Sequence, residues 1–290
     1  MTVWRKAVGL FVRSSHVNWA LLDQAMVSGV NFLTGILLVY FLGAEAFGEF
    51  TLLWMSVLFL NTLQSALIIF PMMSIGPKNP SDEEAAYYGA VIVQQFLFTT
   101  LGFILAGAVC FGLDWLFPAW ELKAVMLPLC VVMVAFQLQE FLRRYFFTIH
   151  RANAAFLNDA ISYLGQLTVL LALFFTVGLD VPKTLWAIAA TSGLAVAVGL
   201  ALIGRVSIEE IHLRQVMTRH WDFAKWLFAS TLMQWLSGNF FIITAGAVLG
   251  PTSVGILKAA QIVQAVLLER LLFSCKLFCS CTFCQQTHYF

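Results

Sequence analysis

Long apolar runs alternate with short polar stretches along nearly the whole chain. A bilayer core about 30 Å thick is crossed by roughly 20 helical residues, so each run predicts a membrane-spanning helix. Strands of a membrane β-barrel would instead alternate apolar and polar residues over about ten positions. The pattern therefore predicts an all-α membrane protein with about eight transmembrane helices. The runs cover residues 20–42, 50–75, 87–111, 125–141, 154–177, 185–203, 224–249 and 253–273.

The composition agrees with this pattern and excludes a soluble protein. The 290 residues are 61% hydrophobic and 11% charged, with a mean hydropathy of +0.87, whereas a soluble domain carries about 25% charged residues. The 16 basic and 15 acidic residues leave a net charge of +1, so no attraction to nucleic acid is expected. The longest mostly polar stretch, residues 205–222, is too short for a separate soluble domain.

The basic residues predict the orientation of the helices, because Lys and Arg accumulate in cytoplasmic segments. If the N-terminus is cytoplasmic, two basic residues, Lys123 and Lys183, fall outside, and Lys258 lies within the last run. We therefore expect a multi-pass protein of the inner (plasma) membrane with both termini in the cytoplasm. The basic residues on the cytoplasmic side are Arg5, Lys6, Arg13, Lys78, Arg143, Arg144, Arg151, Arg205, Arg214, Arg219, Lys225, Arg270 and Lys276.

The first and seventh runs share a pattern at an offset of 207 residues. Gly43 aligns with Gly250, and Gly48 aligns with Gly255, each pair at the same place in a predicted hairpin. Chance similarity between two apolar helices is the alternative, but the matched spacing favours a true repeat. Because the offset spans six helices, both copies point the same way, as in transporters built from parallel repeats.

The repeat divides the chain into predicted parts. The second lobe would hold two helices where the first holds six, so we expect a chain truncated at its C-terminus. Its tail holds four of the six cysteines and His288, at a spacing that matches no standard zinc pattern. A frame-shifted end is favoured over a metal site. The parts are a cytoplasmic N-terminus (1–19), a six-helix lobe (20–205), a cytoplasmic linker (206–223), two helices of a second lobe (224–273) and the tail (274–290).

Most predicted helices carry one polar stripe. In the first helix, Gln24, Ser28 and Asn31 fall on one face, and Asp23 borders it. A single Ser or Thr is explained by packing between helices, but a stripe on most helices predicts a bundle around a hydrated cleft. The candidates for lining this cleft or coupling an ion are Asp23, Gln24, Asn31, Asn61, Gln95, Asp159, Gln166 and Lys258.

Charged residues within the runs need a separate explanation, since a charge at the centre of a membrane helix costs roughly 2.5–3.5 kcal/mol. Asp23, Asp159 and Lys258 lie only a few residues inside their runs. Snorkelling to the interface is therefore the alternative to a transport role, and it is easier for Lys than for Asp. Glu140 with Arg143 and Arg144 is interpreted as an i,i+3/i+4 ion pair at a helix end.

Motifs for catalysis are absent from the sequence. The histidines lie at no metal-ligand spacing, and there is no phosphate loop, paired acidic loop motif or nucleophile elbow. A membrane-embedded transferase should show clusters of His, Asp or Arg in its loops, and none is apparent. We therefore expect no enzyme activity, no metal and no cofactor.

The opening of the repeat resembles a known family. Short pairs rich in Gly, Phe and Leu resemble the polysaccharide exporters of the multidrug/oligosaccharidyl-lipid/polysaccharide flippase superfamily, with O-antigen and teichoic acid translocases as the most similar branch. The resemblance covers roughly residues 19–267. The pairs that carry it are Asp23-Gln24, Ser28-Gly29, Asn31-Phe32, Leu42-Gly43 and Phe47-Gly48.

The resemblance implies two six-helix lobes around a central cleft and alternating access to a lipid-linked sugar. In multidrug relatives an acidic residue of the first helix is a candidate for cation coupling, and Asp23 is the matching position. We therefore expect a flippase that translocates lipid-linked oligosaccharide or polysaccharide precursors through the membrane lipids, with H⁺ or Na⁺ as coupling ion. An inactive truncated remnant or a non-catalytic membrane subunit is the alternative, and a transferase is less favoured.

Overall fold

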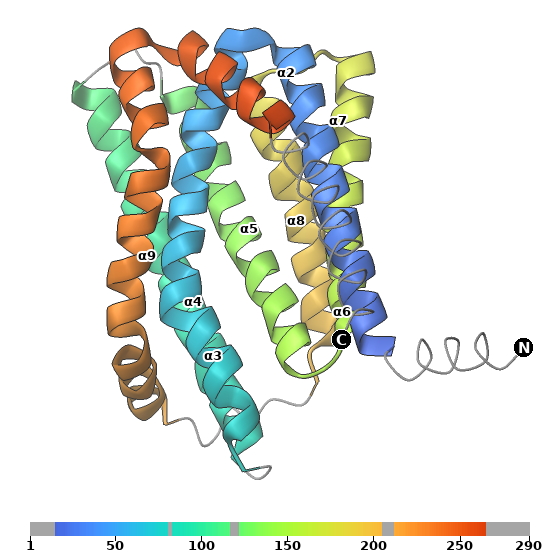
Figure 1. Ribbon diagram of the computed structural model, residues 1–290, viewed down its shortest axis with the longest axis vertical. Coiled ribbons are helices and arrows are strands. Elements are labelled where there is room, and N and C mark those ends of the chain that lie inside the picture. The colour runs from blue at the N-terminus through green and yellow to red at the C-terminus, as the bar shows by residue number, and fades with distance from the viewer. Residues whose placement is uncertain (1–14, 81–82, 117–121, 205–211, 265–290) are drawn as a thin grey trace, which may run out of the picture.

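The computed structural model describes residues 15–80, 83–116, 122–204 and 212–264 (Figure 1). Within these ranges the chain forms helices and no strand. Six of the helices are long and apolar enough to cross a membrane, which indicates a multi-pass membrane protein of the expected all-α class.

Successive helices run alternately from one end of the bundle to the other (Figure 1). Two short segments, η1 and η4, are π-helical, and η2 is a 3₁₀ turn. After α9, residues 251–264 form one more helical stretch. The labelled elements are α2 (Ser15–Gln64), η1 (Ser65–Ile69), α3 (Phe70–Ile75), η2 (Gly76–Lys78), α4 (Glu84–Leu116), α5 (Lys123–Thr148), α6 (Ala152–Asp159), η4 (Ala160–Leu164), α7 (Gly165–Thr176), α8 (Val181–Leu202) and α9 (Leu213–Leu249).

The expected count of about eight transmembrane helices is not confirmed. The first of the six candidate spans, Asn18–Lys78, contains both of the first two predicted runs, because helical structure continues from α2 through α3. The last predicted run, 253–273, lies partly outside the described residues, as does the whole cysteine-rich tail.

Two glycines break the helical path at the same end of the bundle. Gly43 interrupts α2 with φ 75° and ψ 172°, and Gly250 ends α9 with φ 83° and ψ 176°. Residues with a Cβ rarely adopt a positive φ, whereas glycine does so at little cost. The two predicted hairpins therefore turn with nearly the same backbone conformation.

The two hairpins also touch each other through backbone. A Cβ at Gly48 would lie 1.8 Å from the carbonyl oxygen of Pro251, and a Cβ at Gly255 would lie 2.0 Å from that of Ala44. At the offset of 207 residues, Gly48 corresponds to Gly255 and Ala44 corresponds to Pro251. The same pair of positions therefore makes both contacts, with the two hairpins exchanged. The contact is therefore reciprocal, as around a local twofold axis.

Helix α5 occupies the centre of the bundle and packs against α2, α4, α6 and α8 (Figure 1). Its apolar side chains Leu129, Val132 and Met133 are buried in the main core. The predicted end of this helix at residue 141 is wrong, since α5 continues to Thr148. The polar residues that suggested an end, Gln137, Gln139 and Glu140, are instead buried inside the bundle.

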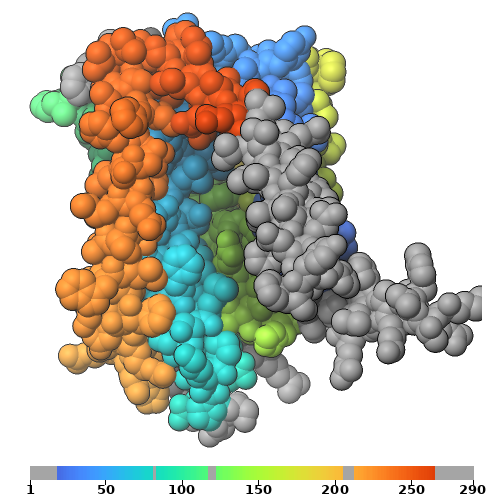
Figure 2. Space-filling view, viewed as in Figure 1, coloured from blue at the N-terminus to red at the C-terminus, as the bar shows by residue number. Residues whose placement is uncertain are grey.

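Helix α9 forms one flank of the molecule (Figure 2). It begins at Leu213, inside the predicted linker, and its first turns bury Val216 and His220. The Nε2 atom of His220 lies 2.9 Å from the Tyr87 hydroxyl of α4. Helix α9 packs on α2, η1, α3 and α4, and much of its remaining surface is exposed and apolar.

Candidate functional site

A cluster of charged side chains is buried within the bundle, centred on Arg143 of α5. It brings together Asp23 from α2, Glu140 from α5 and Asp159 from the end of α6. All four side chains are at most 8% exposed. Such residues inside a membrane bundle mark functional sites far more often than exposed ion pairs do.

The guanidinium of Arg143 reaches all three carboxylates at once. Its Nη2 donates to Asp23 Oδ2 at 2.8 Å, and its Nη1 lies 3.5 Å from Glu140 Oε1. Its Nε lies 2.7 Å from Asp159 Oδ2, but that pair is poorly aligned as a hydrogen bond. The planar, forked guanidinium suits this bridging role, which an ammonium group cannot reproduce.

Neutral side chains complete the cluster. Gln139 donates from Nε2 to Asp159 Oδ1 at 2.8 Å, and the Tyr163 hydroxyl donates to Glu140 Oε1 at 3.1 Å. Asp159 directly precedes the π-helical turn η4, which contains Tyr163. Single π-helical turns within α-helices occur frequently at functional sites, and this one aims two polar side chains at α5.

The charges of the cluster do not balance. Three carboxylates face one guanidinium, and they form no other ion pair among residues 15–80, 83–116, 122–204 and 212–264. With every group ionised the cluster would carry two excess negative charges in a medium of low dielectric constant. The arrangement therefore has room for a proton or another cation.

The cluster lies well inside the helices. Asp23 is eight residues from Ser15 at the start of α2, Arg143 is five from Thr148 at the end of α5, and Asp159 is seven from Ala152 at the start of α6. At 1.5 Å per residue this places them roughly 8–12 Å from that end of the bundle. It is the end where the predicted cytoplasmic connections lie.

The structure decides between the alternatives for the charged residues. Asp23 and Asp159 are 1% and 0% exposed, so snorkelling is wrong for both. The Glu140–Arg143 pair exists with the expected i,i+3 spacing, but its interpretation as a pair at a helix end is wrong because both residues are buried.

Four residues of the cluster were missed as site residues by sequence reasoning: Gln139, Glu140, Arg143 and Tyr163. The signal was present in part, since the fourth apolar run is followed by polar and charged residues at helical spacing. The sequence does not show which carboxylates pair with Arg143, because Asp23 and Asp159 are 120 and 16 positions from it.

The polar stripe on α2 lies on a different face from Asp23. Gln24, Ser28 and Asn31 are exposed, and Gln24 donates to the Ser28 hydroxyl at 3.1 Å. Gly35 continues this face and lies under Ile262 of the last helical stretch. Helix α2 thus turns Asp23 toward α5 and presents its uncharged stripe on the side that Ile262 covers.

The remaining predicted site residues are dispersed. Gln95 is buried on α4 and donates to Thr99 at 2.9 Å, while Gln166 is buried on α7. Asn61 is half-buried on α2. Lys258 is half-buried in the last helical stretch and donates to Gln261 at 3.4 Å.

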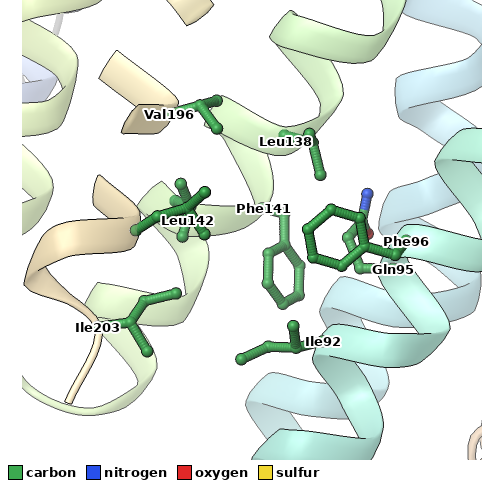
Figure 3. Close-up of a pocket in the computed structure, with 9 residues that line it drawn as sticks. Ile92, Gln95, Phe96, Leu138, Phe141, Leu142, Val196 and Ile203 are labelled. Atoms are coloured by element: carbon green, nitrogen blue, oxygen red, sulfur yellow. The ribbon is translucent and has the colours of Figure 1, made fainter. Parts of the chain in front are cut away.

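A small crevice separates α4, α5 and α8 beside Gln95 (Figure 3). Its lining is apolar apart from this glutamine and includes Phe96, Phe141 and Leu142. The crevice measures about 10 Å³, which is about the space that one water molecule needs. A sugar does not fit there.

Comparison of the chain with protein families, curated proteins and solved structures found no match.

Proposed function

We propose that this protein is a transporter that moves lipid-linked oligosaccharide or polysaccharide precursors across the cytoplasmic membrane by alternating access. The observation that carries the proposal is the buried cluster around Arg143. Burying ion pairs is costly, and apolar residues of similar volume often give a more stable core. A cluster with excess carboxylates is suited to binding and releasing a cation, whereas it contributes little to the stability of the fold.

The placement of polar groups on α2 links this cluster to a path for a substrate. Asp23 contacts Arg143, whereas Gln24 and Asn31 are exposed on an adjacent face of the same helix. A change in the charge of the cluster therefore acts on the helix that carries the uncharged stripe. Hydroxyl-rich sugars are well matched to such amide and hydroxyl side chains.

The start of α9 supports a substrate with a phosphate-bearing head group. Arg214, Thr218 and Arg219 line an open groove of about 650 Å³ at this end of the helix. Trp221 borders the neighbouring groove, as expected of an aromatic residue near a membrane interface. Basic side chains at the predicted cytoplasmic surface are suited to receive a lipid phosphate.

The reciprocal glycine contact supports the proposed two-lobe arrangement. The lobes would be related by rotation about the membrane normal, with α2 and α9 as equivalent first helices. Positions 23, 27 and 30 of α2 then correspond to Ser230, Gln234 and Ser237 of α9. The first set is buried against the lobe, and the second set is exposed.

The proposal is tested by reconstituting the purified protein in vesicles and following a fluorescent polyprenyl-diphosphate-linked oligosaccharide from one leaflet to the other. Asp23→Asn and Asp159→Asn should each reduce the rate at least about tenfold, because each removes a carboxylate partner of Arg143. Asn79→Ala, which removes only a long 3.4 Å exposed contact to Arg219, is the control and should retain transport.

Two results would contradict the proposal. If Asp23→Asn and Asp159→Asn both transport at the unmodified rate, the Arg143 cluster has no part in transport. Absence of glycan transport by the unmodified protein, in vesicles where it is shown to be folded, would favour a non-catalytic membrane subunit instead.

A further inference from the structure

A second group of buried polar side chains lies on the other side of α5 from the Arg143 cluster. It comprises Gln64 of α2, Gln95 and Thr99 of α4, and Gln137 of α5, all of which are at most 5% exposed. We call these four residues the amide cluster. Unlike the Arg143 cluster it contains no charged residue.

Contacts bring the amide cluster together across three helices. Gln64 Nε2 donates to the backbone carbonyl of Gln137 at 2.8 Å. The amide of Gln137 points toward α4, where a Cβ at Gly102 would lie 3.9 Å from both of its terminal atoms. Gln95, Thr99 and Gly102 follow one face of α4 at i, i+4 and i+7, so that face is turned toward Gln137.

The unpaired atoms of the amide cluster are all acceptors. The Oε1 atoms of Gln64, Gln95 and Gln137 have no hydrogen-bond partner within the described residues. The orientation of Gln64 is fixed, because a backbone carbonyl can only accept, so its Nε2 must be the donor. Asn61, one turn earlier on α2, adds another buried unpartnered oxygen.

Buried acceptors without donors are unfavourable by about 1–3 kcal/mol each, so this surplus calls for a bound species. Oxygens from neutral amides and a hydroxyl are the ligand type of hard cations. A divalent ion would need carboxylates to offset its charge, and the cluster has none. A monovalent cation matches the ligands and leaves the smaller uncompensated charge.

We propose that the amide cluster is a binding site for Na⁺ between α2, α4 and α5. Its role as the coupling ion of transport rests on the proposed function, but the binding itself does not. Gln64 directly precedes the π-helical turn η1, and α9 packs against η1, so occupation of the site acts on the contact between η1 and α9.

The test is direct binding of radioactive ²²Na⁺ to the purified full chain, together with its melting temperature in sodium and in N-methylglucamine chloride at equal ionic strength. We expect saturable binding and a melting temperature a few degrees higher in sodium. Gln64→Met and Gln137→Met should each weaken binding at least about tenfold. Both variants should fold, because methionine fills the same volume and removes an unpartnered oxygen.

One control variant locates the site. Gln166→Met changes a buried glutamine outside the amide cluster and should keep sodium binding. Absence of binding to the unmodified chain would overturn the site, as would binding that survives both methionine variants or is lost in Gln166→Met. Sodium binding without glycan transport would leave this site standing and contradict only the transport proposal.

Discussion

At the scale of single residues, the structure depends most on Arg143. The guanidinium contacts carboxylates from α2, α5 and α6, so it joins three segments of the bundle. Removing a partner from a buried ion pair leaves a charge without compensation, which is typically unfavourable by 3–5 kcal/mol. Arg143 therefore stabilises the fold, regardless of which ion the cluster exchanges.

Arg143→Met should lower the free energy of unfolding by about 3–5 kcal/mol, because three buried carboxylates lose their cation. Combining it with Asp23→Asn and Asp159→Asn should restore much of the loss. Denaturant unfolding in detergent micelles measures both effects. Arg144→Met is the matched control, since Arg144 is half-buried and makes no ion pair within the described part of the chain. An equal loss in the two single variants would contradict the central role of Arg143.

At the scale of elements, the packing of α2 against α9 depends on two glycines. Gly48 and Gly255 allow the two hairpins to approach until backbone meets backbone. No flexible side chain lies at these contacts, so a larger residue cannot be accommodated by a change of rotamer. The helical path breaks at Gly43 and ends at Gly250. Gly48 and Gly255 follow these two positions and therefore lie at the same end of the bundle.

Gly48→Ala and Gly255→Ala should each lower the free energy of unfolding by about 2 kcal/mol or more, because the new methyl group would overlap a carbonyl oxygen. Gly238→Ala is the control: no atom lies within 4 Å of its Cβ position, and alanine is the better helix former by about 1 kcal/mol. Thermal unfolding of the three variants measures the difference. If alanine is tolerated equally at all three positions, the close hairpin contact is not present in the membrane.

At the scale of the whole molecule, the connections fall at two ends of the bundle. The break in α2 and the α7–α8 connection lie at one end, and the α3–α4 and α5–α6 connections lie at the other (Figure 1). This arrangement is compatible with the orientation predicted from the basic residues. It leaves open which end faces the cytoplasm.

Cysteine labelling from outside intact cells should reach Asp114→Cys, Asp180→Cys and Thr252→Cys in a chain whose natural cysteines are replaced. The matching variants Lys78→Cys, Arg151→Cys and Arg214→Cys should react only after the membrane is made permeable. The reason is the separation of thirteen basic residues from two. Two positions that react from the wrong side would overturn the predicted orientation.

The candidate site shows where prediction from sequence succeeds and where it stops. Asp23 and Asp159 are conspicuous because a charge in an apolar run needs an explanation. Arg143 is not conspicuous in the sequence, because it follows a short apolar run and resembles a cation at the membrane interface. Its burial follows from the extension of α5 into the bundle, and that depends on packing against neighbouring helices.

The sequence by itself determined that this is a multi-pass helical membrane protein, that its helical path breaks at Gly43 and Gly250, and that Asp23 and Asp159 lie within helices. These follow from apolar length and from glycine and proline, which act over a few residues. Only the tertiary structure decided that Asp23, Glu140 and Asp159 share Arg143, and that Gln24 faces away from them. Those relations depend on the rotation and depth of each helix in the bundle. They are set by close packing between segments far apart in the chain, and no local pattern encodes them.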